Sequence, residues 1–187
     1  MIATDVSAFR AVSSRADGIP HVPRVATRDD AAGIHALIAR YQTPGRLLPR
    51  TEDEIARHAD RFLVSVDEGE IAGCAELAPL STSVAEVRSL VIDEHLRGLG
   101  LGRALVDEIM RDARLDGFAS ICAFTHEPAY FARLGFSLVP HAWLPEKIAM
   151  DCAGCPLFRR CGQAAMRVRL DDERLKSERA TERYACQ

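Results

Sequence analysis

A glycine-rich loop between a predicted strand and a predicted helix constrains this chain more than any other segment. Residues 90–105 read LVIDEHLRGLGLGRAL, so Gly98, Gly100 and Gly102 stand at alternate positions. Residues without Cβ let backbone N–H groups come close to a ligand. The first turn of the following helix adds unpaired N–H donors and the positive end of the helix dipole. The segment therefore predicts a site for a pyrophosphate.

Two arginines and the lack of other phosphate motifs narrow this interpretation. Arg97 and Arg103 flank the glycines and would add positive charge at the rim of the site. The segment has no GK[ST] of a P-loop, and no acidic residue is placed after a following strand as a dinucleotide-binding fold requires. A glycine-rich connection that only turns the chain is the structural alternative.

Hydrophobic periodicity and turn residues predict the remaining elements. The predicted strands are 21–26, 62–66, 71–77, 84–92, 121–125, 136–139 and 164–170, and the predicted helices are about 29–40, 51–58, 101–115 and 128–134. The segment after Pro145 is predicted to be irregular. Hairpins in the first half and a β-α-β unit in the second predict an α+β fold, a mixed sheet with helices on its faces.

Length and composition predict one domain of ordinary size. The chain has 187 residues, of which 48% are hydrophobic and 27% charged, a mixture typical of globular proteins. We expect a flexible N-terminal extension over 1–20, the domain over 21–170 and a charged tail over 171–187. The net charge of -3 gives no reason to expect a nucleic-acid partner. Neither a membrane span of roughly 20 apolar residues nor an export signal is recognisable, so we expect a cytoplasmic protein.

Two motifs resemble those of the GNAT superfamily of N-acetyltransferases. The pattern Arg97-x-x-Gly100-x-Gly102 resembles the acetyl-CoA signature R-x-x-G-x-G/A of that superfamily. The segment 130–136, YFARLGF, looks like its helix-to-strand element. The resemblance implies an acetyl-CoA-dependent enzyme with the GNAT fold, in which a mixed, mostly antiparallel sheet is splayed at its centre and carries helices on both faces.

The resemblance also implies how acetyl-CoA is held. The strand before the loop would offer backbone groups to the pantetheine arm, and the loop would surround the pyrophosphate. A bulge near the splay between 84–92 and 121–125 would aim an N–H group at the thioester carbonyl and stabilise the oxyanion. The residues expected at the cofactor are Leu90, Val91, Ile92, Arg97, Gly98, Leu99, Gly100, Leu101, Gly102 and Arg103.

Glu86 is the candidate general base. Acetyl transfer needs a neutral amine, so a base that removes its proton assists at neutral pH. Glu86 shares a strand face with Arg88 by alternation and matches the basic glutamate of the histone-acetyltransferase branch. An ion pair with Arg88 is the structural alternative. Phe131 stands where many GNAT enzymes carry an acidic tyrosine, and the proton donors considered in its place are Tyr130, Thr125, His126 and water.

Four segments resemble the N-acetylglutamate synthases, which catalyse the first step of bacterial arginine biosynthesis. They are GRLLPRT (45–51), AEVRSLVI (85–92), FTH (124–126) and WLPEK (143–147). An acceptor such as L-glutamate brings two carboxylates and needs cations and backbone donors. The resemblance therefore implies L-glutamate as the acceptor, bound by Leu48, Arg50, Arg88, Thr125, His126 and Lys147.

Alternatives to this acceptor stay open at this point. Arg50 is also typical of a solvated loop, and His126 of an exposed strand end. A protein amino terminus, a polyamine or an antibiotic would be acetylated by the same chemistry. A non-catalytic module that only binds coenzyme A is the hypothesis from another class. Many GNAT proteins are dimers, so a homodimer is considered as well.

Three of the six cysteines lie close together in the sequence. Cys152, Cys155 and Cys161 form the pattern C-x2-C with a further cysteine, which is typical of a zinc knuckle. The fourth ligand would be His141, His126 or Asp151, and no second C-x2-C is present. A structural zinc, a local disulfide and reduced thiols are the three interpretations. Acetyl transfer requires none of them.

Overall fold

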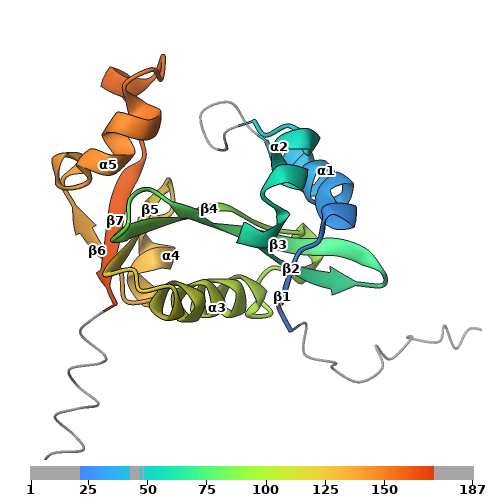
Figure 1. Ribbon diagram of the computed structural model, residues 1–187. Helices are drawn as coiled ribbons and strands as arrows, with labels where there is room; N and C mark the ends of the chain where they lie inside the picture. Colours follow the sequence, from blue (N-terminus) through green and yellow to red (C-terminus); the bar gives the residue numbers. More distant parts are fainter. Residues whose placement is uncertain (1–21, 43–46, 48, 171–187) are drawn as a thin grey trace, which may run out of the picture.

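The computed structural model describes residues 22–42, 47 and 49–170, and these form a seven-stranded sheet with helices on both faces (Figure 1). The predicted extension 1–20 and tail 171–187 lie outside the described residues. The elements are, in chain order, β1 (Arg24–Val25), η1 (Arg28–Asp30), α1 (Ala31–Tyr41), α2 (Glu52–Arg57), η2 (Ala59–Arg61), β2 (Phe62–Asp67), β3 (Glu70–Pro79), β4 (Val84–Ile92), η3 (Glu94–Leu96), α3 (Leu101–Leu115), β5 (Ser120–Thr125), α4 (Pro128–Arg133), β6 (Ser137–Val139), η4 (His141–Trp143), α5 (Pro145–Lys147), η5 (Ile148–Cys152), η6 (Phe158–Arg160) and β7 (Ala164–Arg169).

The sheet is mixed, as predicted. Its strands lie in the order β1-β2-β3-β4-β5-β7-β6, and every neighbouring pair except β4–β5 is antiparallel. Glu68 and Gly69 join β2 to β3 with φ of 50° and 87°. Positive φ at both central residues is the geometry of a type I′ hairpin turn, which matches the twist of the strands. The hairpins of the first half and the β-α-β unit of the second are both confirmed.

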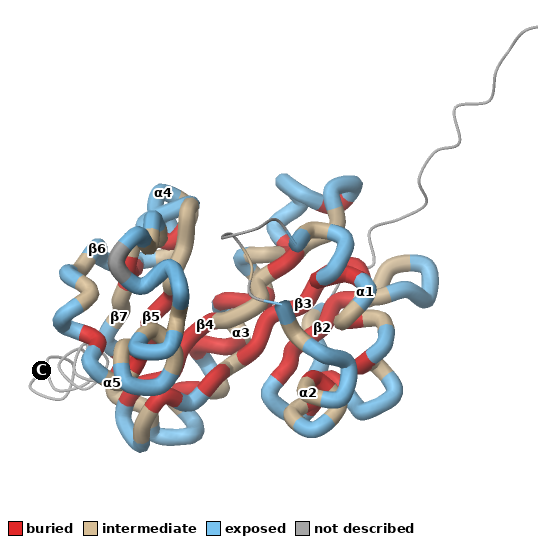
Figure 2. The backbone as a smooth tube through the Cα atoms, turned by 90° about the horizontal axis from the view of Figure 1, so that it is seen from above, coloured by how far each residue is buried: buried red, intermediate tan, exposed pale blue. Residues whose placement is uncertain are grey.

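Alternate residues of the central strands feed two cores on opposite faces of the sheet. In Figure 1, α3 and α4 lie below the sheet, and α1, α2 and α5 lie above it. The lower core joins strand residues Leu63, Ala75 and Val87 to helix residues Leu105, Val106, Ile109, Met110 and Ala113. The upper core joins Phe62, Val64 and Cys74 to Ile34, Leu37 and Ile38. Seen from above, the buried residues continue along β2, β3 and β4 between the two halves of the molecule (Figure 2).

Two predictions about elements were wrong. The first strand is only Arg24–Val25 instead of 21–26, and Pro23 before it has no N–H group to donate to β2. The segment after Pro145 is not irregular, because α5 continues into the π-helical turn η5. Apolar periodicity missed this helix because the buried residue of α5 is the charged Lys147.

Candidate active site

β4 and β5 pair over a short stretch and then diverge. Their parallel pairing covers only Val84–Glu86 against Ser120–Cys122. Within the described ranges, the edge of β4 that faces β5 has no strand partner over 87–92. Backbone groups on this edge are therefore available to an extended ligand, as a peptide-like arm requires.

A β-bulge interrupts β4 beside this opening. The register with β3 shifts between Cys74 and Glu76, which face Val91 and Arg88 respectively. Ser89 lies within the shift and has a φ of 49°, a left-handed value that non-glycine residues seldom adopt. Bulges turn backbone groups away from the regular ladder. The bulge lies where the resemblance to acetyltransferases implied one.

The loop before α3 forms a cradle of free N–H groups. Gly98 and Gly100 have φ of 81° and 89°, and no atom lies within 4 Å of the positions that their Cβ atoms would take. Gly100 is the N-cap of α3 and offers no side chain to cap the helix. Among the described residues, no acceptor takes the N–H groups of Gly98, Gly100, Leu101, Gly102 and Arg103. Free donors at the start of a helix are a binding site for phosphate groups.

The side chains around the cradle contribute less than its backbone. Arg97 donates from Nε to the carbonyl of Ile92 at 3.1 Å, and its guanidinium lies 4.7 Å from the ring centre of Tyr41. Arg103 is 63% exposed and pairs with Asp107 at 3.3 Å. Val91 is buried in the upper core, so only its backbone is open to a ligand. The other predicted cofactor residues, Leu90, Ile92, Leu99 and Leu101, line the same strand, loop and helix start.

Tyr130 approaches the start of α3 from the neighbouring helix α4. A Cβ atom on Gly102 would lie 2.6 Å from the Tyr130 hydroxyl, so the glycine is needed for this close contact. The hydroxyl is buried and has no hydrogen-bond partner in the described part of the chain. Burial, assisted by the charge of Asp107, raises the pKa of Tyr130. A buried hydroxyl without a partner is costly and indicates a position that a ligand can satisfy.

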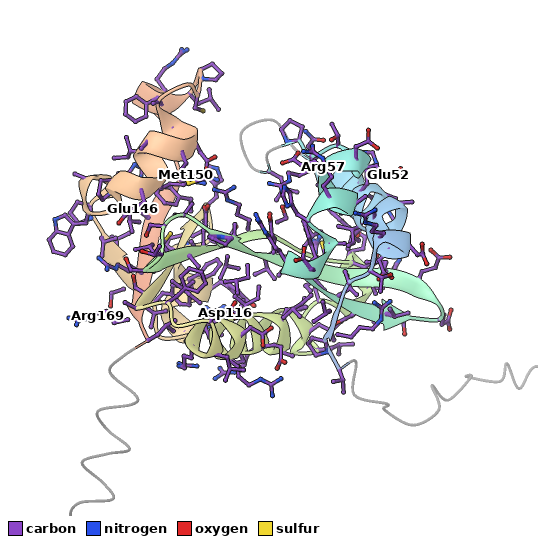
Figure 3. All side chains as sticks on the ribbon, in the orientation of Figure 1. Glu52, Arg57, Asp116, Glu146, Met150 and Arg169 are labelled. Carbon is purple, nitrogen blue, oxygen red and sulfur yellow. The ribbon has the colours of Figure 1, made fainter. Side chains whose placement is uncertain are left out.

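A network of buried charges lies on the other face of β4. Glu86 is 2% exposed, and its Oε2 accepts from Nε of Arg88 at 2.5 Å and from Nζ of Lys147 at 2.8 Å. Oδ2 of Asp151 accepts from the same Lys147 at 3.0 Å and from Arg88. Figure 3 shows side chains converging between α5 and α2 above the sheet. The pair Glu86–Arg88, stated above as the structural alternative, is thus present, and Lys147 joins it.

Arg50 lies on the same face of the sheet, where it contacts Glu76 of β3. Its Nη2 donates to Oε2 of Glu76 at 2.8 Å, and its Nε lies 3.4 Å from Oε1 of Glu54. Burial raises the pKa of Glu76, and the cations Arg50 and Arg88 only partly offset this effect. For Arg88, the neighbouring opposite charges have a larger effect on the pKa than burial has. Burial opposes its charge, but Glu86 and Asp151 outweigh burial and raise the pKa.

Sequence reasoning missed two members of this network. Glu76 carries the one charge within the apolar stretch IAGCAEL, and that isolated charge was the available signal. Asp151 stands four residues after Lys147, a spacing that brings two side chains together on a helix. The signal was hidden because the segment was predicted to be irregular.

The other predicted acceptor residues are Thr125, His126 and Leu48. Thr125 ends β5, and its Oγ1 accepts from the N–H of Glu127 at 2.9 Å, which shapes the turn into α4. The ring of His126 lies near Gly162, ahead of β7. Leu48 lies outside the described residues.

The cysteine cluster does not form a metal site. Cys152, Cys155 and Cys161 are free thiols, and the described residues contain no group of three or more ligands that could hold a metal ion. Two candidates for a fourth ligand are engaged elsewhere, because His141 bonds the carbonyl of Gln163 at 2.8 Å and Asp151 bonds Lys147. The zinc interpretation is therefore unsupported, and the disulfide is not formed.

Two other features of the described chain bear on function. A cavity of about 360 Å³ lies between α1, the β2–β3 hairpin and η3, and none of the predicted site residues lines it. No helix in the described ranges is both long and apolar enough to span a bilayer.

Known sequences are similar to this chain over most of the described domain. The profile of the Acetyltransferase (GNAT) family matches residues 31–136. An uncharacterized N-acetyltransferase of Chlorobaculum tepidum is 31% identical over 137 residues, which are 73% of this chain and 88% of that protein. An amino-acid acetyltransferase of Pseudomonas putida is 32% identical over 113 residues, which are 60% of this chain and 26% of that enzyme.

Solved structures show the same fold. The N-acetylglutamate synthase of Neisseria gonorrhoeae, complexed with coenzyme A and N-acetyl-glutamate, superposes with a TM-score of 0.71 at 25% identity, over 79% of this chain and 34% of that one. A Mycobacterium tuberculosis protein in complex with CoA gives a TM-score of 0.70 at 22% identity, over 79% of this chain and 98% of that one. The chain spans only about a quarter of the Pseudomonas enzyme and a third of the Neisseria enzyme.

Proposed function

The chain belongs to the Acetyltransferase (GNAT) family and is an acetyl-CoA-dependent N-acetyltransferase, and we propose that it acetylates the α-amino group of an amino acid, L-glutamate in particular. The observation that carries this acceptor is a group of three cations beside two buried carboxylates: Arg50 pairs with Glu76, and Arg88 and Lys147 pair with Glu86. The similarity to the Neisseria synthase, solved with N-acetyl-glutamate, supports the same acceptor. Such a reaction is the first step of arginine biosynthesis.

The coenzyme side of the site fits acetyl-CoA. The free N–H groups at the start of α3 would bind the pyrophosphate, and the open edge of β4 at Leu90 and Ile92 would pair with the pantetheine arm. The bulge at Ser89 would turn an N–H group toward the thioester carbonyl. One such donor to a developing oxyanion contributes about 3 kcal/mol to lowering the barrier.

Glu86 and Tyr130 are the proposed proton-transfer groups. In the reaction a C–N bond forms, the C–S bond breaks, the amine loses a proton and the thiolate gains one. Two cations hold Oε2 of Glu86, so its other oxygen is the one that would align a water to accept the amine proton. The unpartnered hydroxyl of Tyr130, on the coenzyme side, is the proposed donor toward the departing thiolate.

The acceptor would lie over the opposite face of β4. Arg50 is the proposed partner of the α-carboxylate, because a guanidinium matches a carboxylate with two parallel hydrogen bonds. Arg88 and Lys147 would face the side chain of the acceptor. The residues proposed to complete this pocket are Thr125, His126 and Leu48.

Steady-state kinetics with an Arg50 variant test the acceptor. Thiol release is measured with a panel of amino acids, a polyamine and an N-terminal peptide. We expect Arg50→Ala to raise the KM for glutamate about 30-fold or more, since a charge-assisted bidentate pair is lost. Coenzyme A affinity, measured by calorimetry, should stay within about twofold, because Arg50 is not near the cradle. Arg57→Ala is the matched control, since Arg57 is exposed on α2 (Figure 3). Unchanged glutamate kinetics in Arg50→Ala would remove the assignment.

A further inference from the structure

The ion pairs of the acceptor side already engage every cation that we assign to the acceptor. Arg50 meets Glu76 at 2.8 Å, and Lys147 meets Glu86 at the same distance. Arg88 meets Glu86 at 2.5 Å and also pairs with Asp151. An incoming carboxylate therefore competes with carboxylates of the chain itself. Its affinity depends on which of these the protein can release.

Asp151 differs from the other carboxylates of the network. Glu76 and Glu86 are strand residues, each 2% exposed, and the sheet fixes their positions. The side chain of Asp151 is 27% exposed and comes from η5, which with α5 stands over the sheet beside the labelled Glu146 and Met150 (Figure 3). Asp151 is thus the more solvent-accessible of the two carboxylates that pair with Arg88 and Lys147.

One oxygen of Asp151 bridges two cations. Oδ2 accepts from Nζ of Lys147 at 3.0 Å and from the guanidinium of Arg88. In the proposed function, the same two groups bind the side-chain carboxylate of a dicarboxylic amino acid. The residue therefore imitates the second carboxylate of such an acceptor.

We infer that Asp151 is a specificity-determining residue, which occupies the position of the acceptor's second carboxylate and weakens the preference for a dicarboxylic amino acid over its amide. The inference rests on the proposed function. Glutamate adds a negative charge beside Asp151, whereas the carboxamide of glutamine adds hydrogen bonds and no charge. A like charge built into a site acts against one of two competing ligands. The chain should therefore acetylate glutamine about as well as glutamate.

The ratio of kcat/KM for glutamate to that for glutamine tests the inference. Asp151→Asn keeps the shape and the hydrogen-bonding oxygen of the side chain and removes its charge. We expect the KM for glutamate to fall about tenfold, as for removal of a like charge from a partly buried site, and the KM for glutamine to stay within about twofold. Glu146→Gln is the matched control, because it removes a carboxylate one residue before Lys147 that makes no ion pair among the described residues. The ratio should not change in this control.

Three outcomes would overturn the inference. An unchanged ratio in Asp151→Asn means that its charge does not act on the acceptor. An equal fall of kcat for both amino acids means that Asp151 only holds Arg88 and Lys147 in place. If the wild type binds coenzyme A by calorimetry but acetylates neither amino acid, the proposed acceptor class fails and the inference with it. Wild-type rates separate this last result from the first two. Asp151→Ser and thermal melting identify a folding defect, and a ratio that rises in both variants supports the inference.

Discussion

The two sides of β4 differ in the groups that form them. On the coenzyme side, the start of α3 presents backbone N–H groups of a glycine loop, and the nearby Arg103 is 63% exposed. On the proposed acceptor side, the site consists of charged side chains, of which Glu86 and Lys147 are 2% and 5% exposed. A backbone site tolerates changes in the surrounding side chains. A side-chain site depends on every charge that balances its neighbours.

The difference fits the two tasks. A turn of main-chain donors recognises the pyrophosphate of coenzyme A whatever the local side chains are. The acceptor has to be distinguished from related amines, and specificity of this kind comes from placed charges and from repulsion. Buried charges are tolerated on that side because each of the carboxylates Glu76, Glu86 and Asp151 has at least one cation as its partner.

Truncation of one cation on each side gives the largest expected contrast. Lys147→Met leaves the buried Glu86 with one cation instead of two, and we expect a loss of about 3 kcal/mol in the free energy of unfolding. Arg103→Met removes an exposed pair with Asp107, and we expect a change within about 0.5 kcal/mol. Urea unfolding of both variants measures the contrast. Equal losses would contradict the distinction between the two sides.

Replacing a glycine of the loop by alanine should weaken coenzyme A binding and leave the acceptor side unchanged. Gly100 has a φ of 89°, so Gly100→Ala strains the turn by about 1–2 kcal/mol although its Cβ meets open space. We expect coenzyme A affinity to fall about tenfold, since the strain is relieved by moving the N–H groups. Calorimetry with coenzyme A measures it. Gly154→Ala is the control, because Gly154 has no positive φ and its Cβ also meets open space. A weaker effect at Gly100 than at Gly154 would exclude the cradle.

The coenzyme side was predictable from sequence because it is local. Strand, glycines and helix follow one another within sixteen residues, and the positive φ of Gly98 and Gly100 is a direct consequence of that order. The predicted bounds of β4 and α3 agree with the structure for the same reason. Local propensities and the loop chemistry favour the same conformation there.

The acceptor side was only partly predictable because its residues are far apart in the chain. Arg50 and Glu76 are 26 residues apart and Glu86 and Lys147 are 61 apart, so their pairing depends on the register of the sheet and the position of η5. The resemblance to the N-acetylglutamate synthases, together with the positive charge that a dicarboxylic acceptor needs, identified Arg50, Arg88 and Lys147 as candidates. Their carboxylate partners Glu76 and Asp151 required the three-dimensional arrangement.

Substitution of Gly102 by alanine should have a smaller effect on stability, and its sign should depend on whether the Tyr130 hydroxyl is present. Gly102→Ala places a Cβ atom 2.6 Å from the Tyr130 hydroxyl, so we expect it to destabilise the protein by about 1 kcal/mol. In the Tyr130→Phe background the obstructing oxygen is gone. There, the higher helix propensity of alanine should make Gly102→Ala stabilise the protein by about 0.5–1 kcal/mol. Thermal unfolding of the four proteins tests this. The same sign in both backgrounds would show that the hydroxyl does not approach the helix.

A surface ion pair far from both sites gives a small expected effect and serves as a reference for the buried network. The hydrogen bond from Arg24, and those from Thr27, hold the pKa of Asp30 well below its ordinary value of about 3.9. A lowered pKa stabilises the fold above the ordinary value, and this contribution is lost as the pH falls through the folded value. Arg24 is 47% exposed, so solvent screening limits the loss in Asp30→Asn to about 1 kcal/mol at pH 7. The difference from the wild type should shrink between about pH 4 and pH 2. A difference that grows toward low pH would contradict the assignment, and one as large as that of Lys147→Met would remove the contrast between surface and buried charges.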